Sequence, residues 1–291
     1  MSGAESLLLA APSRGPAAEA LARLLAHRSF LIGGALVLLV LALALSADLL
    51  SPFDPLRNNA RARFRPPEFP YWFGTDHFGR DILTRVLHGA RISLTIGAAV
   101  ALTTGVFGTL IGATAGFFPR LDNPLMRLMD AFMAFPAILL AITVSAVLGA
   151  SVTNVVIALS VATTPHTARI VRGSVLVVRE LEYVEAARAL GASEGRVLVR
   201  HVLLNALGPL IVRLTYVFAI AILSEAALSF IGVGPPPPAP SFGNIIAQGR
   251  DFMADAPWIT LFPGLAIVVS VLGLNLLGDG LRDVLDPRLR P

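Results

Sequence analysis

The sequence predicts an all-α membrane protein with six transmembrane helices. Of its 291 residues, 55% are hydrophobic and only 14% are charged, whereas a soluble domain usually carries about a quarter charged residues. The mean hydropathy of +0.74 agrees with a chain that lies largely within a bilayer. A spanning helix needs roughly 20 mostly apolar residues. Six segments come close to this requirement: 30–47, 92–118, 131–150, 152–168, 207–231 and 259–277.

The segments between these spans give the predicted domain organisation. The first transmembrane helix occupies 30–50 and is expected to stay uncleaved. The alternative is a signal peptide, since Ala44-Leu45-Ser46-Ala47 weakly resembles a cleavage site, but the preceding tail and the apolar run are both long for one. The remaining parts are a cytoplasmic tail (1–29), an outer loop (51–90), a five-helix core (91–278) with a cytoplasmic insert (169–205) and an outer loop (232–258), and a cytoplasmic tail (279–291).

Arginine placement predicts that both termini lie in the cytoplasm. Six spans put the termini on one side, and basic residues are enriched in cytoplasmic loops. With the N-terminus inside, roughly twice as many arginines fall in inner as in outer segments, although the arginine-rich loop 51–90 is an exception. Arg91 and Arg213 stand at span ends, where their side chains can reach the interface. The expected location is therefore the cell (inner) membrane, with several passes.

Several kinds of site are excluded by composition. The chain has no cysteine, and its five scattered histidines form no HExxH pair, so we predict no metal site. Its basic residues are all arginine. A P-loop ATPase needs a lysine for the nucleotide phosphates, so a partner must bind ATP if ATP drives this protein. The arginines flank apolar runs, which indicates contact with membrane lipid and not with nucleic acid.

A charged stretch at 182–205 interrupts the apolar sequence. On a helix, Glu182, Glu185 and Arg188 share one face, opposite a thin apolar face. The apolar face consists of Tyr183, Val184, Ala186, Ala187, Leu190 and Gly191. Gly191 is a natural helix stop, and Ser193 can cap a second helix that runs toward Asn205. We interpret the stretch as a helix–turn–helix that docks on a partner; the alternative is a solvated loop.

The same stretch contains a G-x-S-x-G match from Gly191 to Gly195, the nucleophile-elbow pattern of hydrolases. That motif requires a strand before the serine, and helical sequence precedes Ser193 here. We therefore predict a helix cap and no catalytic residue.

Two features concern packing within the membrane. Gly108, Gly112 and Gly116 lie four residues apart and form a small-residue face, for which intrachain packing is favoured over a subunit contact. Pro136 and Pro165 are expected to cause local kinks, with hinges as the alternative.

Four blocks of the sequence resemble one known family. The segment EYVEAARALGASEGR (182–196) is similar to the EAA loop of binding-protein-dependent ABC transporter permeases. Three blocks resemble the C-type subunits of dipeptide and oligopeptide permeases. They are WFGTDHFGRDILTRVLHGARISL (72–94), EAALSFIGVGPPPPAPSFGNIIAQGR (225–250) and PWITLFPGLAIVVSVLGLNLLGDGLRDVLDPR (257–288). Together the blocks cover most of residues 72–288.

The resemblance implies a permease subunit of an ABC importer for dipeptides, oligopeptides or related solutes, which forms the translocation path with a second permease. Its implied partners are a homologous second permease, two ATP-binding subunits that hold ATP and Mg²⁺, and an extracytoplasmic solute-binding protein. It implies that Glu182, Tyr183, Glu185, Ala186, Ala187, Gly191, Ala192 and Ser193 couple to the ATPases. Leu203-Leu204 stands where the family often has Leu-Pro, so the second coupling helix is expected to continue further.

Polar residues outside the insert leave alternatives open. Glu225 and Asn275 lie in predicted spans and belong to the translocation path, an outer gate or the structural framework, with the framework favoured. Asp76, Arg80 and Asp81 either order the first outer loop or contact the binding protein. Asp279, Arg282, Asp283 and Asp286 indicate a solvated inner tail. The alternative function is a stand-alone secondary transporter or channel, which would usually show inverted repeats or charges at mid-depth.

Overall fold

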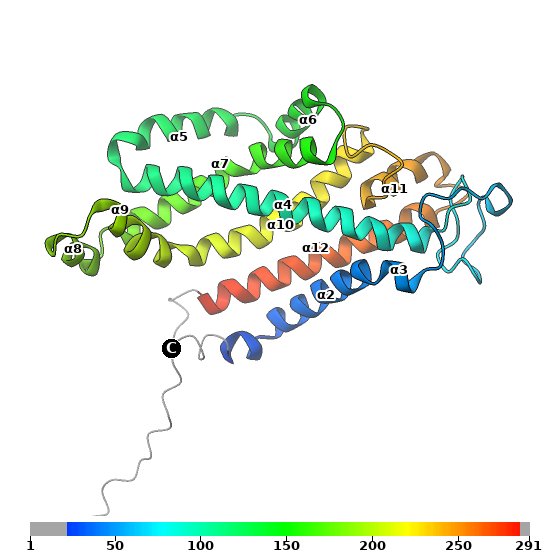
Figure 1. Cartoon of the computed structure of the whole chain (residues 1–291), viewed down its shortest axis with the longest axis horizontal. Coiled ribbons are helices and arrows are strands. Elements are labelled where there is room, and N and C mark those ends of the chain that lie inside the picture. Colours follow the sequence, from blue (N-terminus) through cyan, green and yellow to red (C-terminus); the bar gives the residue numbers. More distant parts are fainter. Residues whose placement is uncertain (1–21, 286–291) are drawn as a thin grey trace, which may run out of the picture.

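The structure, a computed structural model, describes residues 22–285 and is an elongated bundle of helices (Figure 1). Arg14 and Asp286, which the sequence analysis assigned to the two cytoplasmic tails, lie outside the described residues. Five long helices form the bundle: α2 (Arg28–Leu45), α4 (Ile82–Phe117), α7 (Val152–Val178), α10 (Leu207–Phe230) and α12 (Trp258–Leu285). The shorter ones are α3 (Ala47–Leu50), α5 (Pro119–Met133), α6 (Ala137–Leu148), α8 (Glu182–Ala189), α9 (Glu194–Arg196) and α11 (Phe242–Gly249).

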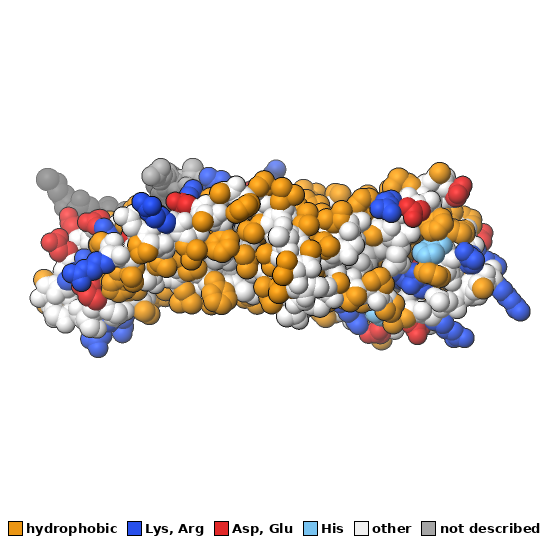
Figure 2. All heavy atoms as spheres, turned by 90° about the horizontal axis from the view of Figure 1, so that it is seen from above, with side chains coloured by type: hydrophobic (Ala, Val, Ile, Leu, Met, Phe, Trp, Pro, Cys, Tyr) orange, Lys and Arg blue, Asp and Glu red, His pale blue; other side chains and the backbone are white. Residues whose placement is uncertain are grey.

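The bundle has the surface of a membrane protein. In Figure 2 hydrophobic side chains cover its middle, and charged side chains gather at its two ends. One end carries α8 and α9, and the other carries α3, α11 and the loop 51–81 (Figure 1). We call residues 182–206 the coupling element, after the role that the family resemblance implies for them, and we call residues 51–81 together with 232–257 the outer cap.

Four helices in the described residues are long and apolar enough to cross a membrane: α2, α4, the continuous helix Glu194–Phe230, and α12. A fifth candidate is the pair α5 and α6, which is bent by 87°. The helix α7 has 27 residues, but polar residues such as Asn154 and His166 lower its hydropathy. The all-helical membrane fold is therefore confirmed. By length and composition the described residues contain four or five candidate spans, and the six spans that the sequence predicts stay a prediction.

The third predicted span, 131–150, is not a straight helix. Apolar residues begin inside α5, the chain breaks at Ala134–Pro136, and α6 adds only 12 residues. Pro136 is the N-cap of α6, because proline disfavours helical geometry in the residue before it. The break is much larger than the local kink expected there, whereas Pro165 lies inside an uninterrupted α7.

Three other helices are longer than their predicted spans. The helix α4 begins at Ile82, ten residues before 92, because Arg85 and His88 are accommodated within the fold and do not end the helix. The helix α7 continues through Arg169 and Arg172 to Val178, since these arginines pair with Asp130 and Asp122 of α5. The helix α12 runs to Leu285, so the described part of the expected inner tail is helical.

The glycine face of α4 packs within the chain, as predicted. A Cβ at Gly108 would meet Thr167, one at Gly112 would meet the backbone of Ala168, and one at Gly116 would meet Val175. Only hydrogen at these positions lets α4 and α7 approach this closely. The first transmembrane helix is tied in the same way, because Gly33 of α2 lies against the backbone of α12. The bundle therefore includes α2 as an integral helix.

Candidate coupling site

The coupling element begins with α8, which is anchored by one side chain. Val184 is completely buried and packs in a cluster with Val178 of α7 and with Val197 and Val202 of the following helix. The Tyr183 hydroxyl donates a hydrogen bond to the carbonyl oxygen of His201 at 3.1 Å. These contacts fix α8 against the next helix and leave its other faces to the solvent.

The small-residue face predicted for docking is only partly covered. Ala186, Leu190 and Gly191 are exposed, and Ala187 is half-buried. The carboxylates of Glu182 and Glu185 are exposed on the other side of the helix. Leu190 has 89% of its surface accessible, which is unusual for a leucine in a well-ordered turn. The described residues thus leave this side of α8 open to another protein.

The turn after α8 has the geometry predicted for it. Gly191 has φ +81°, a left-handed conformation that costs other residues roughly 1–2 kcal/mol. Its N–H donates to Arg188 O at 2.9 Å, and the N–H of Ala192 donates to Ala187 O at 3.1 Å. These two bonds form a Schellman motif, which satisfies the last carbonyls of α8. Gly191 is confirmed as the stop of the first coupling helix.

Ser193 differs from its prediction in one respect. It occupies the N-cap position of α9 with extended backbone geometry, but its side chain makes no capping hydrogen bond. The Arg188 guanidinium instead lies 3.4 Å from the carboxylate of Glu194, the first residue of α9. Because α8 precedes Ser193, the strand that a nucleophile elbow requires is absent there, and the G-x-S-x-G match has no catalytic context.

The second coupling helix continues into the membrane domain, as the missing Leu-Pro predicts. Residues Glu194–Phe230 form one continuous helix, with a π-helical segment at Val197–Leu203 and a short 3₁₀ segment before α10. Arg188 also lies over the ring of Phe117 at the end of α4, 5.4 Å from its centroid. The helix α8 therefore contacts both the end of α4 and the helix that continues as α10.

The outer cap contains a buried charge cluster that joins its two loops. Asp76 accepts a hydrogen bond from Arg80 Nε at 2.7 Å and lies 3.6 Å from Arg85 Nη1. Both guanidiniums also donate to Gln248 Oε1 of α11, at 2.7 and 3.0 Å. All three charged side chains are buried. The sequence leaves two roles open for Asp76 and Arg80. Their buried contacts support the first role, which is to order the outer loop.

Asp81 is the N-cap of α4. Its Oδ2 accepts hydrogen bonds from the backbone N–H of Thr84 at 2.7 Å and from the Thr84 hydroxyl at 2.5 Å. Burial raises the pKa of the Asp81 carboxyl, and the bonds from Thr84 offset this in part. Asp81 therefore starts α4, which has 36 residues, and binding-protein contact by Asp76, Arg80 and Asp81 stays a prediction.

Glu225 is completely buried at the outer end of α10. Its carboxylate accepts hydrogen bonds from three hydroxyls: Ser229 at 2.8 Å, Ser241 at 2.8 Å and Ser93 at 3.1 Å. These serines belong to α10, the outer cap and α4. The bond from Ser241 ties Glu225 to the loop that follows the prolines, and the network supports the structural role that the sequence favours for Glu225.

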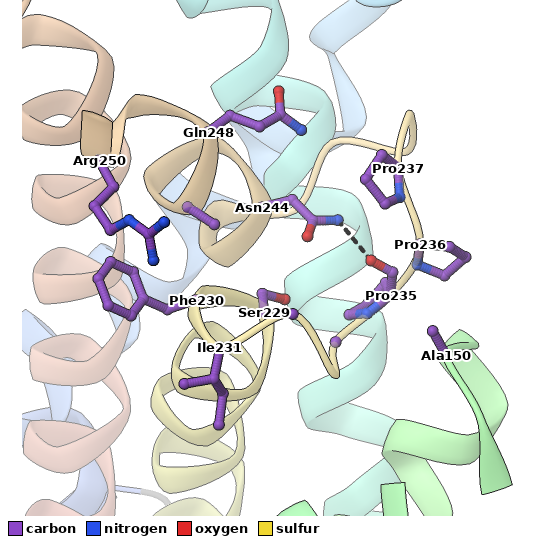
Figure 3. A pocket seen from close by; sticks show the side chains of 13 residues that line it. Ala150, Ser229, Phe230, Ile231, Pro235, Pro236, Pro237, Asn244, Gln248 and Arg250 are labelled. Carbon is purple, nitrogen blue, oxygen red and sulfur yellow. Dashed lines mark hydrogen bonds between the residues drawn. The ribbon is translucent and has the colours of Figure 1, made fainter. Parts of the chain in front are cut away.

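Four consecutive prolines, Pro235–Pro238, favour a stiff and extended run within the second outer loop, but this run forms bends and turns. The loop folds back through turns and contains α11. The side-chain amide of Asn244 in α11 donates to Pro235 O at 3.0 Å and to Ala239 O at 3.1 Å, which closes the proline segment onto the helix. Figure 3 shows the resulting pocket of about 430 Å³, bounded by Pro235–Pro237, Asn244, Phe230 and Arg250.

Asn275 lies at the opposite end of the bundle from this pocket. It is exposed and lines a hollow of about 270 Å³ between α7, α10 and α12. Arg213, Tyr216, Asp279 and Arg282 line the same hollow. The sequence analysis treated Arg213 only as an arginine at a span end, and it overlooked Arg85 and Gln248. A lone charge in a span marks Arg213, but no local pattern links Gln248 to arginines more than 160 residues away.

No group of three or more histidine, aspartate or glutamate side chains within residues 22–285 has the geometry to hold a metal ion. The sequence-predicted residues fall into three places: the coupling element, the outer cap and the inner hollow.

Comparisons with known proteins agree with this arrangement. Residues 106–291 match the family model described as binding-protein-dependent transport system inner membrane component. Residues 15–67 match the N-terminal transmembrane domain of oligopeptide transport permease C. The fold resembles the methionine ABC transporter MetNI in an inward-facing conformation, with a TM-score of 0.57 and 20% identity over 69% of this chain and 96% of that chain. That likeness concerns the fold alone.

Several bacterial proteins are similar over nearly their whole length. A Brucella abortus protein, provisionally named peptide transport system permease protein, is 56% identical over 92% of this chain and 90% of its own. The dipeptide transport system permease of Alkalihalophilus pseudofirmus is 41% identical over 94% and 91%. The glutathione transport system permease of Pectobacterium atrosepticum is 40% identical over 95% and 93%.

Proposed function

The chain belongs to the family of binding-protein-dependent transport system inner membrane components, the permeases of ABC importers, and we propose that the solute it carries is a dipeptide or oligopeptide. It is a multi-pass protein of the inner membrane and a transport permease, not an enzyme. The names of its relatives support the peptide class, and both a dipeptide and a glutathione permease share about the same identity with it.

The proposed topology has six crossings with both termini in the cytoplasm. The crossings are α2, α4, the bent pair α5–α6, α7, the helix Glu194–Phe230, and α12. The helix α7 is included because it packs along α4 and runs from the outer pocket toward the coupling element (Figure 1). The excess of arginine in the segments then assigned to the cytoplasm supports this orientation.

The proposed partners are a second permease, two ATP-binding subunits and an external solute-binding protein. The observation that carries the ATPase contact is the open side of α8, where Ala186 and Gly191 are exposed while Val184 alone is buried. Small side chains let another backbone approach, and the exposed Glu185 carboxylate suits an arginine or lysine of the ATPase. The lack of lysine supports ATP and Mg²⁺ sites on those partner subunits.

The proposed cycle is a conformational one. ATP binding favours closure of the two ATPase subunits, and the coupling elements move with them as rigid bodies. Because the second coupling helix continues as α10, this movement reorients the membrane helices and opens the path outward. ATP can drive this change only by binding the two states of the assembly unequally.

The test uses the complete importer in proteoliposomes, with uptake of labelled dialanine and retention of the ATPase subunits as readouts. Glu185→Lys and Gly191→Trp are each expected to lower ATP-driven uptake at least tenfold and to reduce ATPase retention, while membrane insertion is unchanged. Glu68→Lys is the matched control, because Glu68 is an exposed carboxylate of the outer cap. It should leave ATPase retention at the wild-type level.

Normal uptake and normal ATPase retention in both coupling variants would refute the coupling role. A chain that purifies without ATPase subunits and still transports would support the second candidate, a stand-alone secondary transporter or channel.

A further inference from the structure

The helix α10 is central in the bundle, yet one of its faces is open. It packs against α4, α7, α11 and α12 (Figure 1). Residues on a single face, three and four positions apart, are nevertheless exposed or half-buried along its whole length. They are Pro209, Arg213, Tyr216, Ile220, Leu223, Ala227 and Phe230. The intervening positions Val217, Ile222 and Leu228 are buried, so the open face is a property of the packing and not of a loosely attached helix.

This face joins the two hollows described above. Phe230 lines the outer pocket of about 430 Å³ beside Pro235 and Arg250 (Figure 3). Pro209, Arg213 and Tyr216 line the inner hollow of about 270 Å³. A continuous strip of surface therefore leads from one end of the bundle to the other along a single helix.

Arg213 is the charged residue on this strip, and it has no counter-ion in the described residues. Its Nε lies 3.4 Å from the Thr167 hydroxyl, and its guanidinium lies 5.1 Å from the centroid of the Tyr216 ring. Neither partner is charged. An ionisable side chain inside a membrane domain is costly and usually has a function. A guanidinium held against an aromatic ring beside a hollow remains free to bind an anion.

The other residues that line the hollow also favour the binding of an anion. Asn275 adds an amide, and Arg282 and Asp279 add one charge of each sign. With Arg213, the hollow carries two guanidiniums and one carboxylate, an excess of one positive charge. Because these groups come from α10 and α12, relative movement of the two helices changes the distances among them.

We propose that Arg213 binds the carboxylate of the passing solute at the inner mouth of the path, and that the open face of α10 forms this chain's wall of that path. The inference rests on the proposed function, which supplies the solute class: a peptide with a free C-terminus carries a carboxylate. A guanidinium binds a carboxylate through two parallel hydrogen bonds. Transport requires that such a site release its ligand readily, and Asp279 in the same hollow competes for the cation.

The first experiment measures access to the open face in the complete importer. The chain has no cysteine, so single cysteines can be introduced at Tyr216, Leu223 and, as a buried control, Val217. Small membrane-impermeant thiol reagents, one anionic and one cationic, are then applied to inside-out and right-side-out vesicles. Tyr216→Cys and Leu223→Cys are expected to react, and Val217→Cys is expected to stay unmodified.

The same assay measures the charge of Arg213. At Tyr216→Cys the anionic reagent should react faster than the cationic one, and adding Arg213→Gln should lower that ratio by about fivefold. An unreactive Leu223→Cys would mean that lipid or another subunit covers the face, and would overturn the proposal. A ratio unchanged by Arg213→Gln would overturn the role of Arg213.

The second experiment measures transport of labelled dialanine at saturating binding protein. Arg213→Gln should lower uptake about tenfold, Arg213→Lys should restore part of it, and ATP hydrolysis stimulated by binding protein should stay within twofold of wild type. Loss of both uptake and ATP hydrolysis without rescue by lysine would indicate a structural role and refute the proposal. Failure of the proposed function is distinguishable, since the wild-type assembly would then show no ATP-driven uptake.

Discussion

The two ends of the bundle treat charged residues in opposite ways. At the outer end, Asp76 of the outer cap contacts both Arg80 of the same cap and Arg85 of α4, and all three side chains are buried. In the coupling element, Glu182 and Glu185 are exposed on a helix that a single valine anchors. The outer end thus pairs these three charges within the chain, whereas the coupling element leaves its two carboxylates open. The difference shows that the charged side chains at the outer end already have partners in the single subunit, whereas Glu182 and Glu185 are exposed.

The buried cluster of the outer cap links segments that are far apart in the sequence. Gln248 joins the second outer loop to Arg80 of the first outer loop and to Arg85 of α4. At the start of α12, Trp258 Nε1 donates to Thr75 O at 3.0 Å. A buried ion pair seldom adds much net stability, but removing one partner is severe, because the remaining charge stays buried and uncompensated. The comparison between the two ends can therefore be tested by substitution.

The largest effect is expected for Asp76→Ala. This change leaves two buried guanidiniums without their carboxylate, so the outer cap should lose about 3–5 kcal/mol of stability. Hydrogen–deuterium exchange of residues 74–82, measured by mass spectrometry on the complete importer, should accelerate roughly 100-fold or more. Glu182→Ala is the matched control, since it removes an exposed carboxylate from the coupling element. It should change exchange in α8 less than threefold, and equal effects at the two ends would contradict the comparison.

A smaller effect is expected for Gly191→Ala at the coupling end. The left-handed φ of +81° and the open space around Gly191 mean that only backbone strain opposes the added methyl group. The cost is about 1–2 kcal/mol, visible as roughly tenfold faster exchange of the α8 amides.

Gly195→Ala provides the control for this prediction. Gly195 also has open space around it, but it is helical, so alanine there should stabilise by about 0.5–1 kcal/mol. If Gly191→Ala and Gly195→Ala changed the exchange of the α8 amides in the same direction, the left-handed turn at Gly191 would not determine the stability of α8.

Local sequence signals predicted the coupling element well. Apolar and charged residues of 182–191 alternate with helical spacing, and Gly191 followed by Ser193 marks a stop and a restart. The face Gly108, Gly112 and Gly116 likewise predicted close packing, and the structure places α7 against it. Such features depend on residues within a few turns of each other, so a single sequence contains the information.

The sequence-based predictions were wrong or incomplete where contacts between residues far apart in the sequence determine the structure. The sequence assigns Arg85 to the first outer loop and Arg172 to the cytoplasmic insert, although they pair with Asp76 and Asp122 and lie within the helices α4 and α7. The sequence does not predict the open face of α10 either. Which of its residues are exposed depends on where the neighbouring helices pack, and those helices come from distant parts of the chain. Hydrophobicity along α10 gives no sign of this, since Leu223 is exposed and Ile222 is buried.

The smallest effect concerns the pH dependence of the outer cap. His77 lies between Phe78 and Phe252, with ring centroids 4.0 and 4.9 Å away. Burial lowers its pKa below the ordinary value of about 6.5, and the nearby arginines lower it further against the opposing charge of Asp76. The folded state therefore disfavours protonated His77. Its contribution to stability is complete above about pH 6.5 and is lost as the pH falls from there toward the folded-state pKa.

Lowering the pH from 7.5 to 5.5 should therefore accelerate hydrogen–deuterium exchange of the outer cap, after correction for intrinsic rates. The acceleration should be smaller than the effect of Gly191→Ala on α8 or of Asp76→Ala on the outer cap. Asp81 titrates in the same cap, but its raised pKa acts in the opposite direction, destabilising the cap as the pH rises above about 4. His77→Gln isolates the histidine, because the difference between wild type and variant removes the share of Asp81. A difference that stays constant over this pH range would show that protonation of His77 does not weaken the cap, and the outer end would then be insensitive to mild acid.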